Sequence, residues 1–363
     1  CSFHPAYQWL TGMAEINHHT LSDFRVDHKE KLDELFTQVL GLLSAENLIT
    51  LERITQDGTK IKACASLKSF RGEEKIHAHL ELARTQVAAM GDPRESGGKK
   101  RETAKARGLN DRRERLEKAL EQLPKIRELK KSEADKRDAR VSETDPDARI
   151  MKQSGGGFAP SYNVQLSVDA AHDIIVNVDV SQSGTDHGEL TGSVRKVEER
   201  TGIKPAQVVA DTGYTNHANI LSMSDAKIDF FGSFPDKSGL VDATYERRGI
   251  APEFRNEAFH YDAIADKYVC PTGHDLHHAY KDARRAGIIQ HAYEAKAGIC
   301  AACPHLSACH PGMKKQGRQV MRSVALPQIV AFHEKMETAE AKAIYRTRSK
   351  TAEFPNAWIK EKF

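Results

Sequence analysis

The sequence predicts an α/β fold in which a mixed sheet is covered by helices. The clearest observation is the alternation of polar and apolar residues at 162–168 and again at 174–180, which predicts an antiparallel hairpin. A second is the apolar run Val208-Val209-Ala210, which is typical of a strand buried on both faces. The third is the order of the stretches after the hairpin: a helix at about 187–200, this strand, a helix at about 216–223 and a strand at 228–234. Such an order indicates a mixed sheet with helices packed against it.

Residues 1–47 predict a helical module at the start of the chain. Apolar residues recur there at helical spacing in two stretches, the second of which contains Leu32, Phe36 and Leu40. A small helical unit that ends in a recognition helix is one of the arrangements that bind DNA. Plain packing is the commoner use of short helix pairs, so on its own the pattern fits both.

Two acidic residues stand where a predicted strand meets a turn. A stretch rich in β-branched residues leads into Asp57-Gly58, and Asp-Gly is a strong turn signal, so the local pattern predicts a hairpin with a second strand at 60–65. Asp211 directly follows the apolar run that ends at Ala210 and precedes Thr212-Gly213. Taken alone, Asp211 is better explained as the cap of the helix that begins near Asn216.

Residues 67–157 predict a charged helical insertion. Between Arg94 and Arg140 there are 17 Lys or Arg residues against 10 Asp or Glu, so the positive charge of the chain is concentrated here. A helical stripe from Leu109 to Leu123 is interrupted at Pro124, and Gly91 to Gly98 indicates a flexible link. The insertion is either a solvated surface or, in a nucleic-acid enzyme, a surface that follows phosphates.

Four of the six cysteines predict a structural zinc site. These are Cys270, Cys300, Cys303 and Cys309. The Cys-x2-Cys spacing is that of thiolate zinc ligands, and four protein ligands leave no position for water. The alternative ligands in the same stretch are His274, His305 and His310. The other interpretation is a set of reduced cysteines without metal, since a cytosolic chain does not normally form disulfides.

Composition excludes some classes of protein. No apolar run approaches the ~18 residues that a membrane span needs, and no charged-then-apolar segment indicates secretion. We therefore expect a cytoplasmic protein without membrane contacts. The net charge of +3 is too small to indicate nucleic acid by itself. The chain begins with Cys1 and its last helical pattern still runs at Phe363, so we expect truncation at both ends.

The last helical pattern runs from Pro327 and carries an ordered set of polar residues. Tyr345, Arg348, Glu353 and Lys360 follow the spacing Y-x2-R-x4-E-x6-K. Without further context, this is a basic helix with one acid among several.

Together these residues resemble the DDE-type insertion-sequence transposases, in the branch with a Tyr-Arg-Glu-Lys motif around its last acid. The resemblance extends from about Trp9 to Lys360. It rests on five ordered motifs: Asp57-Gly58-Thr59-Lys60, the segment 144–152, Tyr162-Asn163-Val164-Gln165, Ala210-Asp211-Thr212-Gly213-Tyr214, and the motif from Tyr345 to Lys360. Some relatives have three residues between the Arg and the Glu of the last motif, whereas this chain has four.

The resemblance implies an RNase H-like catalytic core, a mixed five-stranded sheet with flanking helices. Its catalytic carboxylates would be Asp57, Asp211 and Glu353, holding two Mg²⁺ or Mn²⁺ ions, because hard cations prefer oxygen ligands. The expected contacts to DNA phosphate come from Tyr345, Arg348 and Lys360. The implied activity is endonucleolytic cleavage at transposon ends and strand transfer, with double-stranded terminal-repeat and target DNA as partners of a homodimer.

The expected domain layout follows from these assignments. It consists of a DNA-binding module at 1–47, a catalytic core at 48–66 and 158–235, the charged insertion at 67–157, a cysteine-rich, zinc-ribbon-like insertion at 236–325, and a catalytic helix region at 326–363. Two alternatives remain open. One is a catalytically inactive DNA-binding remnant of a transposase, and the other is an RNase H-like nuclease that acts without transposition.

Overall fold

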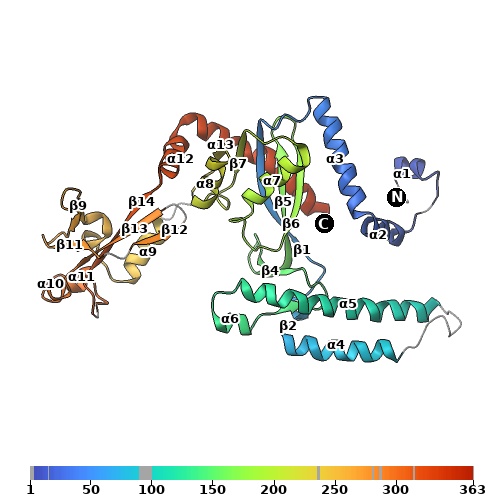
Figure 1. Ribbon diagram of the computed structural model, residues 1–363, viewed down its shortest axis with the longest axis horizontal. Helices are drawn as coiled ribbons and strands as arrows, with labels where there is room; N and C mark the ends of the chain where they lie inside the picture. Colours follow the sequence, from blue (N-terminus) through green and yellow to red (C-terminus); the bar gives the residue numbers. More distant parts are fainter. Residues whose placement is uncertain are drawn as a thin grey trace.

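The computed structural model describes residues 4–14, 16–89, 100–234, 238–279, 282–285, 288–313 and 315–362. A central mixed sheet carries helices on both faces, a helical hairpin extends below it, and a second β-rich module lies at one end of the molecule (Figure 1). The prediction of an α/β fold with mixed strands and flanking helices is confirmed.

The central sheet is built around β1 (Arg53–Lys62). Along one side, β1 pairs with antiparallel β5 (Phe158–Asp169), and along the other it pairs with parallel β7 (Gln207–Ala210). The remaining strands are β4 (Arg149–Lys152) and β6 (Ile174–Ser181), both paired with β5, and β8 (Asp229–Phe231), paired with β7. The sheet thus has six strands where five were expected, because β4, which we expected within the helical insertion, extends the same edge of β5 as β6.

The predicted turn at Asp57-Gly58 is wrong, because β1 runs straight through both residues. Every residue from Ile54 to Lys62 has a partner in β5, so the strand is fixed by its neighbour over its whole length. The antiparallel hairpin formed by β5 and β6 is as predicted, with Asp173 at a φ of 56° in the connection.

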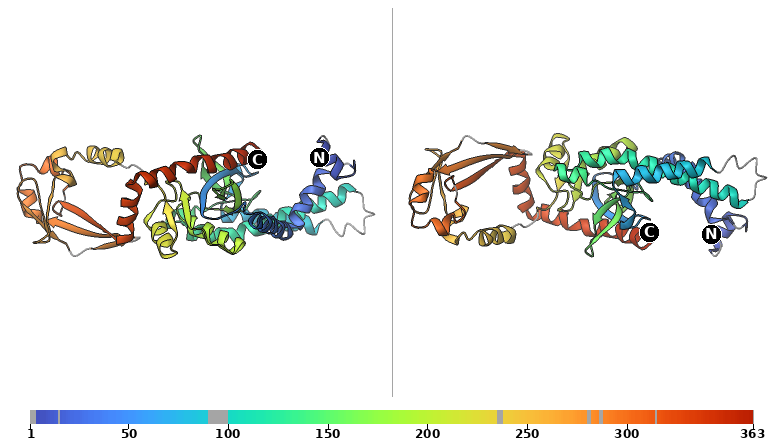
Figure 2. Two further views of the ribbon diagram at one scale, coloured as in Figure 1. Left: turned by 90° about the horizontal axis from the view of Figure 1, so that it is seen from above. Right: turned by 90° about the horizontal axis from the view of Figure 1, so that it is seen from below.

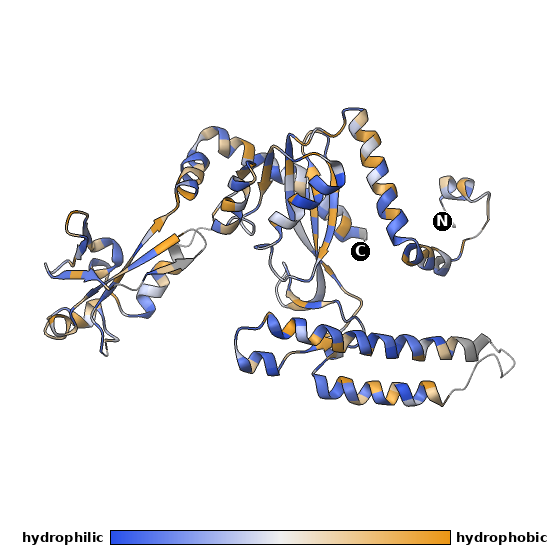
Figure 3. Ribbon diagram, viewed as in Figure 1, coloured by the Kyte–Doolittle hydropathy of each residue, from blue (hydrophilic) through white to orange (hydrophobic). Residues whose placement is uncertain are grey.

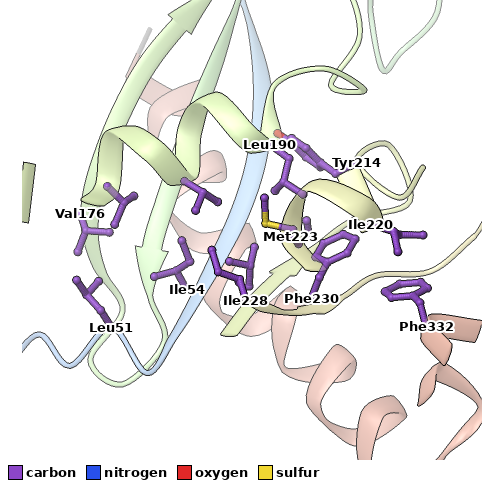
Figure 4. Packing of buried hydrophobic residues seen from close by; sticks show 14 of the residues in the cluster. Leu51, Ile54, Val176, Leu190, Tyr214, Ile220, Met223, Ile228, Phe230 and Phe332 are labelled. Atoms are coloured by element: carbon purple, nitrogen blue, oxygen red, sulfur yellow. The ribbon is translucent and has the colours of Figure 1, made fainter. Parts of the chain in front are cut away.

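Helices cover opposite faces of the sheet. Val208 and Ala210 of β7 face the main core, together with α7 (Leu190–Thr201) and α8 (His217–Asp225), while Val209 faces α13 (Ala339–Lys362). Figure 2 shows α13 lying along one side of the sheet. Figure 4 shows the main core, in which residues from β1, both core helices and α12 (Pro327–Glu337) meet. The side chains of β7 therefore pack into two hydrophobic layers, one on each face of the sheet, as expected for a strand buried on both faces.

Two helical units project from the sheet. One contains α1 (Pro5–Leu10), α2 (His18–Asp27) and α3 (Lys29–Ala45). The other is a hairpin of α4 (Glu73–Ala88) and α5 (Lys100–Glu128), followed by α6 (Glu133–Arg137). The helix α5 continues past Pro124, where we expected an interruption, and most of its residues are hydrophilic (Figure 3). The predicted link Gly91 to Gly98 lies outside the described residues. Short strands β2 (Phe70–Arg71) and β3 (Val141–Ser142) pair at the base of the hairpin.

The module at the end of the molecule holds the four cysteines of the predicted zinc site. It begins with α9 (Ser238–Arg247) and contains a second six-stranded sheet. Its strands are β9 (His260–Asp262), β10 (Lys267–Val269), β11 (Asp275–His278), β12 (Ala283–Arg285), β13 (Ile288–Ala295) and β14 (Gln319–Ala325), with short helices α10 (Ala297–Ala301) and α11 (Leu306–Cys309). From β14 the chain enters α12 and then α13, so that the C-terminal helical pattern is divided at Thr338.

Candidate active site

Parallel pairing of β1 and β7 brings the two predicted aspartates together. Gln56 lies opposite Ala210 in the register, so Asp57, inside β1, and Asp211, the first residue after β7, are the next residues along the two segments. The carboxyl end of a parallel strand, here β7, is the usual position for a ligand site in an α/β sheet. The sequence separation of these two residues is large, and the register alone makes them neighbours.

Asp211 starts a tight loop and does not cap a helix. Its Oδ1 accepts a hydrogen bond from the Gly213 N–H at 2.7 Å. The cap of α8 is Asn216, whose side-chain oxygen accepts from the Asn219 N–H at 3.0 Å. The interpretation of Asp211 as a helix cap is therefore wrong, and its second carboxylate oxygen is left for other partners.

Asp57 is a partly buried carboxylate with cationic and amide neighbours from α13. Its Oδ1 accepts from the Gly58 N–H at 2.8 Å, and its Oδ2 lies 3.0 Å from Asn356 Nδ2 and 3.4 Å from Arg348 Nη1. Burial raises the pKa of Asp57 to about 6; Gly58 and Arg348 oppose the rise, and nearby Asp211 and Asp186 add to it. A carboxylate that is buried beside other carboxylates favours a bound cation, because the cation offsets both costs.

The other residues of the C-terminal motif lie along the same helix. Glu353 is exposed one turn before Asn356, and within the described residues it makes no hydrogen bond or ion pair to either aspartate. Tyr345 packs against the small apolar cluster formed by Val209, Phe231 and Ala341. Lys360 lines a cavity of about 280 Å³ next to Gly58 and Thr59. The structure thus brings Asp57, Asp211 and Arg348 together and leaves Glu353 on the flank of the helix.

Two site residues were missed by the sequence analysis. Asn356 donates to Asp57, and Asp186, in the loop between β6 and α7, lies close enough to raise the pKa of Asp57. The signal for Asp186 was the one used for Asp211, an acid at a glycine-rich turn between a strand and a helix. Asn356 carried no signal, because its role depends on how α13 lies across the sheet.

The donor set at the two aspartates suits a hard divalent cation. All the candidate ligand atoms are oxygens, and the Oδ2 of Asp211 accepts no hydrogen bond from a described residue. The side-chain oxygen of Asn356 is buried and also unpartnered within the described part of the chain. Carboxylate and amide oxygens are the ligands that Mg²⁺ and Mn²⁺ prefer.

The four cysteines of the predicted zinc site converge in the second module. They line one pocket with His274, His310 and Arg318. Burial raises the pKa of the Cys309 thiol, Arg318 opposes the rise, and the other three cysteines add to it, as expected for four neighbouring thiols. Backbone N–H groups of His274 and Arg318 donate to the sulfurs of Cys270 and Cys300 at 3.2 and 3.4 Å. These two contacts help to fix the positions of the Cys270 and Cys300 sulfurs.

The sulfurs are close without being at ligand distance from one another. In the described part of the chain, the group of three or more donor side chains whose atoms all lie within 4.8 Å of each other is His278, Asp282 and His291. Asp282 Oδ1 lies 2.8 Å from His278 Nε2 and 2.9 Å from His291 Nδ1, so the acid already satisfies both rings.

Comparison with known families gives one match, which covers the C-terminal part of the chain. Residues 269–363 match the family model of the transposase DDE domain. No curated protein and no solved structure matches the chain. The match supports a transposase function, and it contains the four cysteines and the motif from Tyr345 to Lys360, whereas Asp57 and Asp211 lie outside it. Among the described residues, no helix combines the length and apolar character of a membrane span.

Proposed function

We propose that this chain is a DDE transposase that cleaves double-stranded DNA at transposon ends and joins the ends to target DNA. The observation that supports it best is the meeting of β1, the β7 loop and α13 at one site. Asp57 and Asp211 are adjacent by register, and the helix that carries Glu353 contacts Asp57 through residues on both sides of that glutamate. The match to the transposase DDE domain includes this helix.

The residues have distinct tasks in this proposal. Asp57, Asp211 and Glu353 hold the divalent cations, and Glu353 reaches them by a change of side-chain rotamer from its exposed position on α13. When bound, two cations supply activation of a water or a 3′ hydroxyl and stabilisation of the leaving oxygen. Arg348 balances the charge of Asp57 before a cation arrives, because its guanidinium already faces that carboxylate.

Basic residues beside the carboxylates form the proposed phosphate contacts. Lys360 of α13, Lys60 of β1 and Lys152 of β4 line the cavity next to Gly58. Lysine side chains from three separate elements around one cavity can follow a phosphate backbone without reading sequence. We propose that the DNA strand enters here, with Tyr345 supporting the helix from its apolar side.

The cysteine module has a structural role in the proposal. Zinc held by Cys270, Cys300, Cys303 and Cys309 would draw the four sulfurs together and fix the short helices α10 and α11 to the sheet. The active complex is a homodimer that brings two transposon ends together.

The test is DNA cleavage and joining by single variants. The substrate is duplex DNA that contains the sequences flanking the reading frame, with Mg²⁺ present. D57N, D211N and E353Q should each lower cleavage by at least about a hundredfold, because each removes a cation ligand. D173N is the matched control, since Asp173 is exposed in a turn whose positive φ suits Asn.

The products separate the alternatives. Cleavage without joined products would indicate a nuclease that does not transpose. Binding without cleavage by the unmodified chain would indicate an inactive remnant. Full cleavage by D57N or D211N would remove that residue from the mechanism.

A further inference from the structure

A row of buried polar side chains crosses the core beneath the active site. Gln165 and Ser167 of β5 and Gln56 of β1 are all fully buried. Ser167 Oγ donates to Gln56 Oε1 at 2.6 Å, and Gln56 Nε2 donates to Gln165 Oε1 at 3.0 Å. The hydroxyl of buried Tyr214 also donates to Gln165 Oε1. Burying this many polar groups costs free energy unless each is paired. The row therefore indicates that the side chain at its end is held in a fixed position.

The row ends on one oxygen of Asp186. Gln165 Nε2 and Asn163 Nδ2 both donate to Asp186 Oδ1, each at 2.8 Å. The next residue, His187, is tied to the Asp211 loop through hydrogen bonds between its ring and the Gly213 carbonyl and from Asn216 to its own carbonyl. Two amides and a loop anchor therefore fix the direction of this carboxylate.

The second oxygen of Asp186 is free and faces the Asp211 loop. Within the described residues, Asp186 Oδ2 accepts no hydrogen bond. A Cβ built on Gly213 would lie 3.0 Å from Asp211 Oδ1 and 3.6 Å from Asp186 Oδ2, so both acids border the same small space. On the other side, a Cβ on Gly58 would meet Asp186 Oδ1 at 2.6 Å, which places Asp186 against β1 at the residue that follows Asp57.

A separate observation points to a ligand beside Asp186. Asn163 Oδ1 is buried and has no partner within the described part of the chain, although its residue is only 1% exposed. Asn163 and Asp186 line the same cavity, on the face of β1 that Gly58 occupies. Buried polar atoms without partners are rare in folded proteins and mark places where water or an ion belongs. A hydrated cation supplies a donor for this atom, since Mg²⁺ keeps several of its water ligands.

We propose that Asp186 is a further ligand of the divalent cation held by Asp57 and Asp211, with Asn163 Oδ1 accepting from the water around it. This inference rests on the proposed function, because it assigns a ligand to the same site. The other role open to Asp186 is purely structural, as the acceptor that holds the amides of Asn163 and Gln165.

Mn²⁺ affinity separates the two roles without any DNA. Mn²⁺ binding is measured by electron paramagnetic resonance on the full chain, in an H291A background that removes the His278, Asp282 and His291 group. D186N keeps an oxygen that accepts from both amides and removes the charge. It should weaken Mn²⁺ binding by at least about tenfold while its thermal unfolding stays unchanged. D173N is the control and should bind as the background does.

Each outcome has a definite meaning. If D186N binds Mn²⁺ as tightly as the background while D57N and D211N lose it, Asp186 is a structural acceptor and only this inference is overturned. If none of the three variants changes Mn²⁺ binding, the cation centre itself is overturned, and the proposed function with it. A loss in all three supports Asp186 as a ligand.

Discussion

At the scale of single residues, Asp57 is largely shielded from solvent and lies near two acids, Asp211 and Asp186, and one basic side chain, Arg348. Its side chain is 17% exposed, and the only opposing charge in direct contact is Arg348 at 3.4 Å, as far as the described residues show. Burial dominates the balance and raises the pKa to about 6. The fold therefore disfavours the charged form of Asp57, as expected for a carboxylate that binds a cation.

Because the folded protein disfavours ionised Asp57, we predict that D57N stabilises the protein when divalent cations are absent. The folded-state pKa lies above the ordinary value of 3.8, so the wild-type protein loses stability as pH rises from about 4 to about 6. At pH 7.5, D57N should be more stable by up to about 3 kcal/mol, and below pH 4 the difference should vanish. Thermal unfolding across this range in EDTA measures it, and a constant difference at all pH values would contradict it.

Residue-level prediction succeeded where one local pattern was decisive. The run before Asp211 identified its strand, and Asn216 rather than Asp211 proved to be the cap because the loop bends back through Gly213 before α8 begins. Asp186 carried the same type of pattern but lies between a hairpin and a helix. The orientation of the Asp186 carboxylate depends on two side-chain amides of β5, and the sequence alone does not show that these amides lie beside it.

At the scale of elements, β1 shows how pairing overrides a local turn signal. Asp-Gly favours a hairpin tip in isolation, but hydrogen bonds to β5 on one side and β7 on the other hold the strand extended. Gly58 is needed here for space, since its backbone is ordinary but the side chains of Asp186, Gln165 and Tyr214 crowd it.

Gly58→Ala should therefore disturb the site more than a glycine replacement elsewhere. The new Cβ would lie 2.6 Å from Asp186 Oδ1 and from Gln165 Nε2, so these side chains must move and the row of buried hydrogen bonds is broken. We expect a loss of about 1–3 kcal/mol in the free energy of unfolding and a reduced cleavage rate. Denaturant unfolding measures the first.

Gly155→Ala is the matched control for this strand variant. Gly155 lies between β4 and β5, and nothing stands within 4 Å of a Cβ there. It should unfold as the wild type does. Equal stability of the two variants would show that the space beside Gly58 is not limiting.

At the scale of the whole molecule, the two sheets are separate structural units joined by α12 (Figure 1). The second unit has its own small core of aromatic and aliphatic residues, against which Cys270, Cys300 and Cys309 pack. A six-stranded sheet in which four strands have only three or four residues, with the short helices α10 and α11, buries little apolar area. A metal is therefore expected to supply much of the stability of this unit.

Removal of zinc should then unfold the cysteine module and leave the central sheet intact. Hydrogen exchange measured by mass spectrometry with and without a zinc chelator should show lost protection in β13 and β14 and unchanged protection in β1 and β5. Cys300→Ser should have the same effect. Cys64→Ser is the control, because Cys64 is exposed on the other unit. Identical exchange with and without zinc would contradict a structural metal.

Sequence patterns predicted the units of this molecule better than their assembly. Strand stretches at 162–180 and 207–210 were evident from alternation and apolar runs, but the six-strand order depends on pairings between distant segments. The position of α13 across the sheet also depends on contacts between distant segments. Local patterns cannot encode it, because the contacts that fix it come from Val209 and Phe231 on other elements.

The contact between α13 and β1 also affects the order in which the protein is completed during synthesis. Arg348 and Asn356 are 291 and 299 residues away from Asp57 along the chain. The ribosome therefore releases the central strand long before the helix that supplies its charge partner Arg348 and the proposed third carboxylate, Glu353. Domains form as they emerge, so the sheet can assemble while its acidic site is still incomplete. If the chain cleaves DNA as proposed, a nascent chain should be unable to cut DNA until α13 has docked on β1.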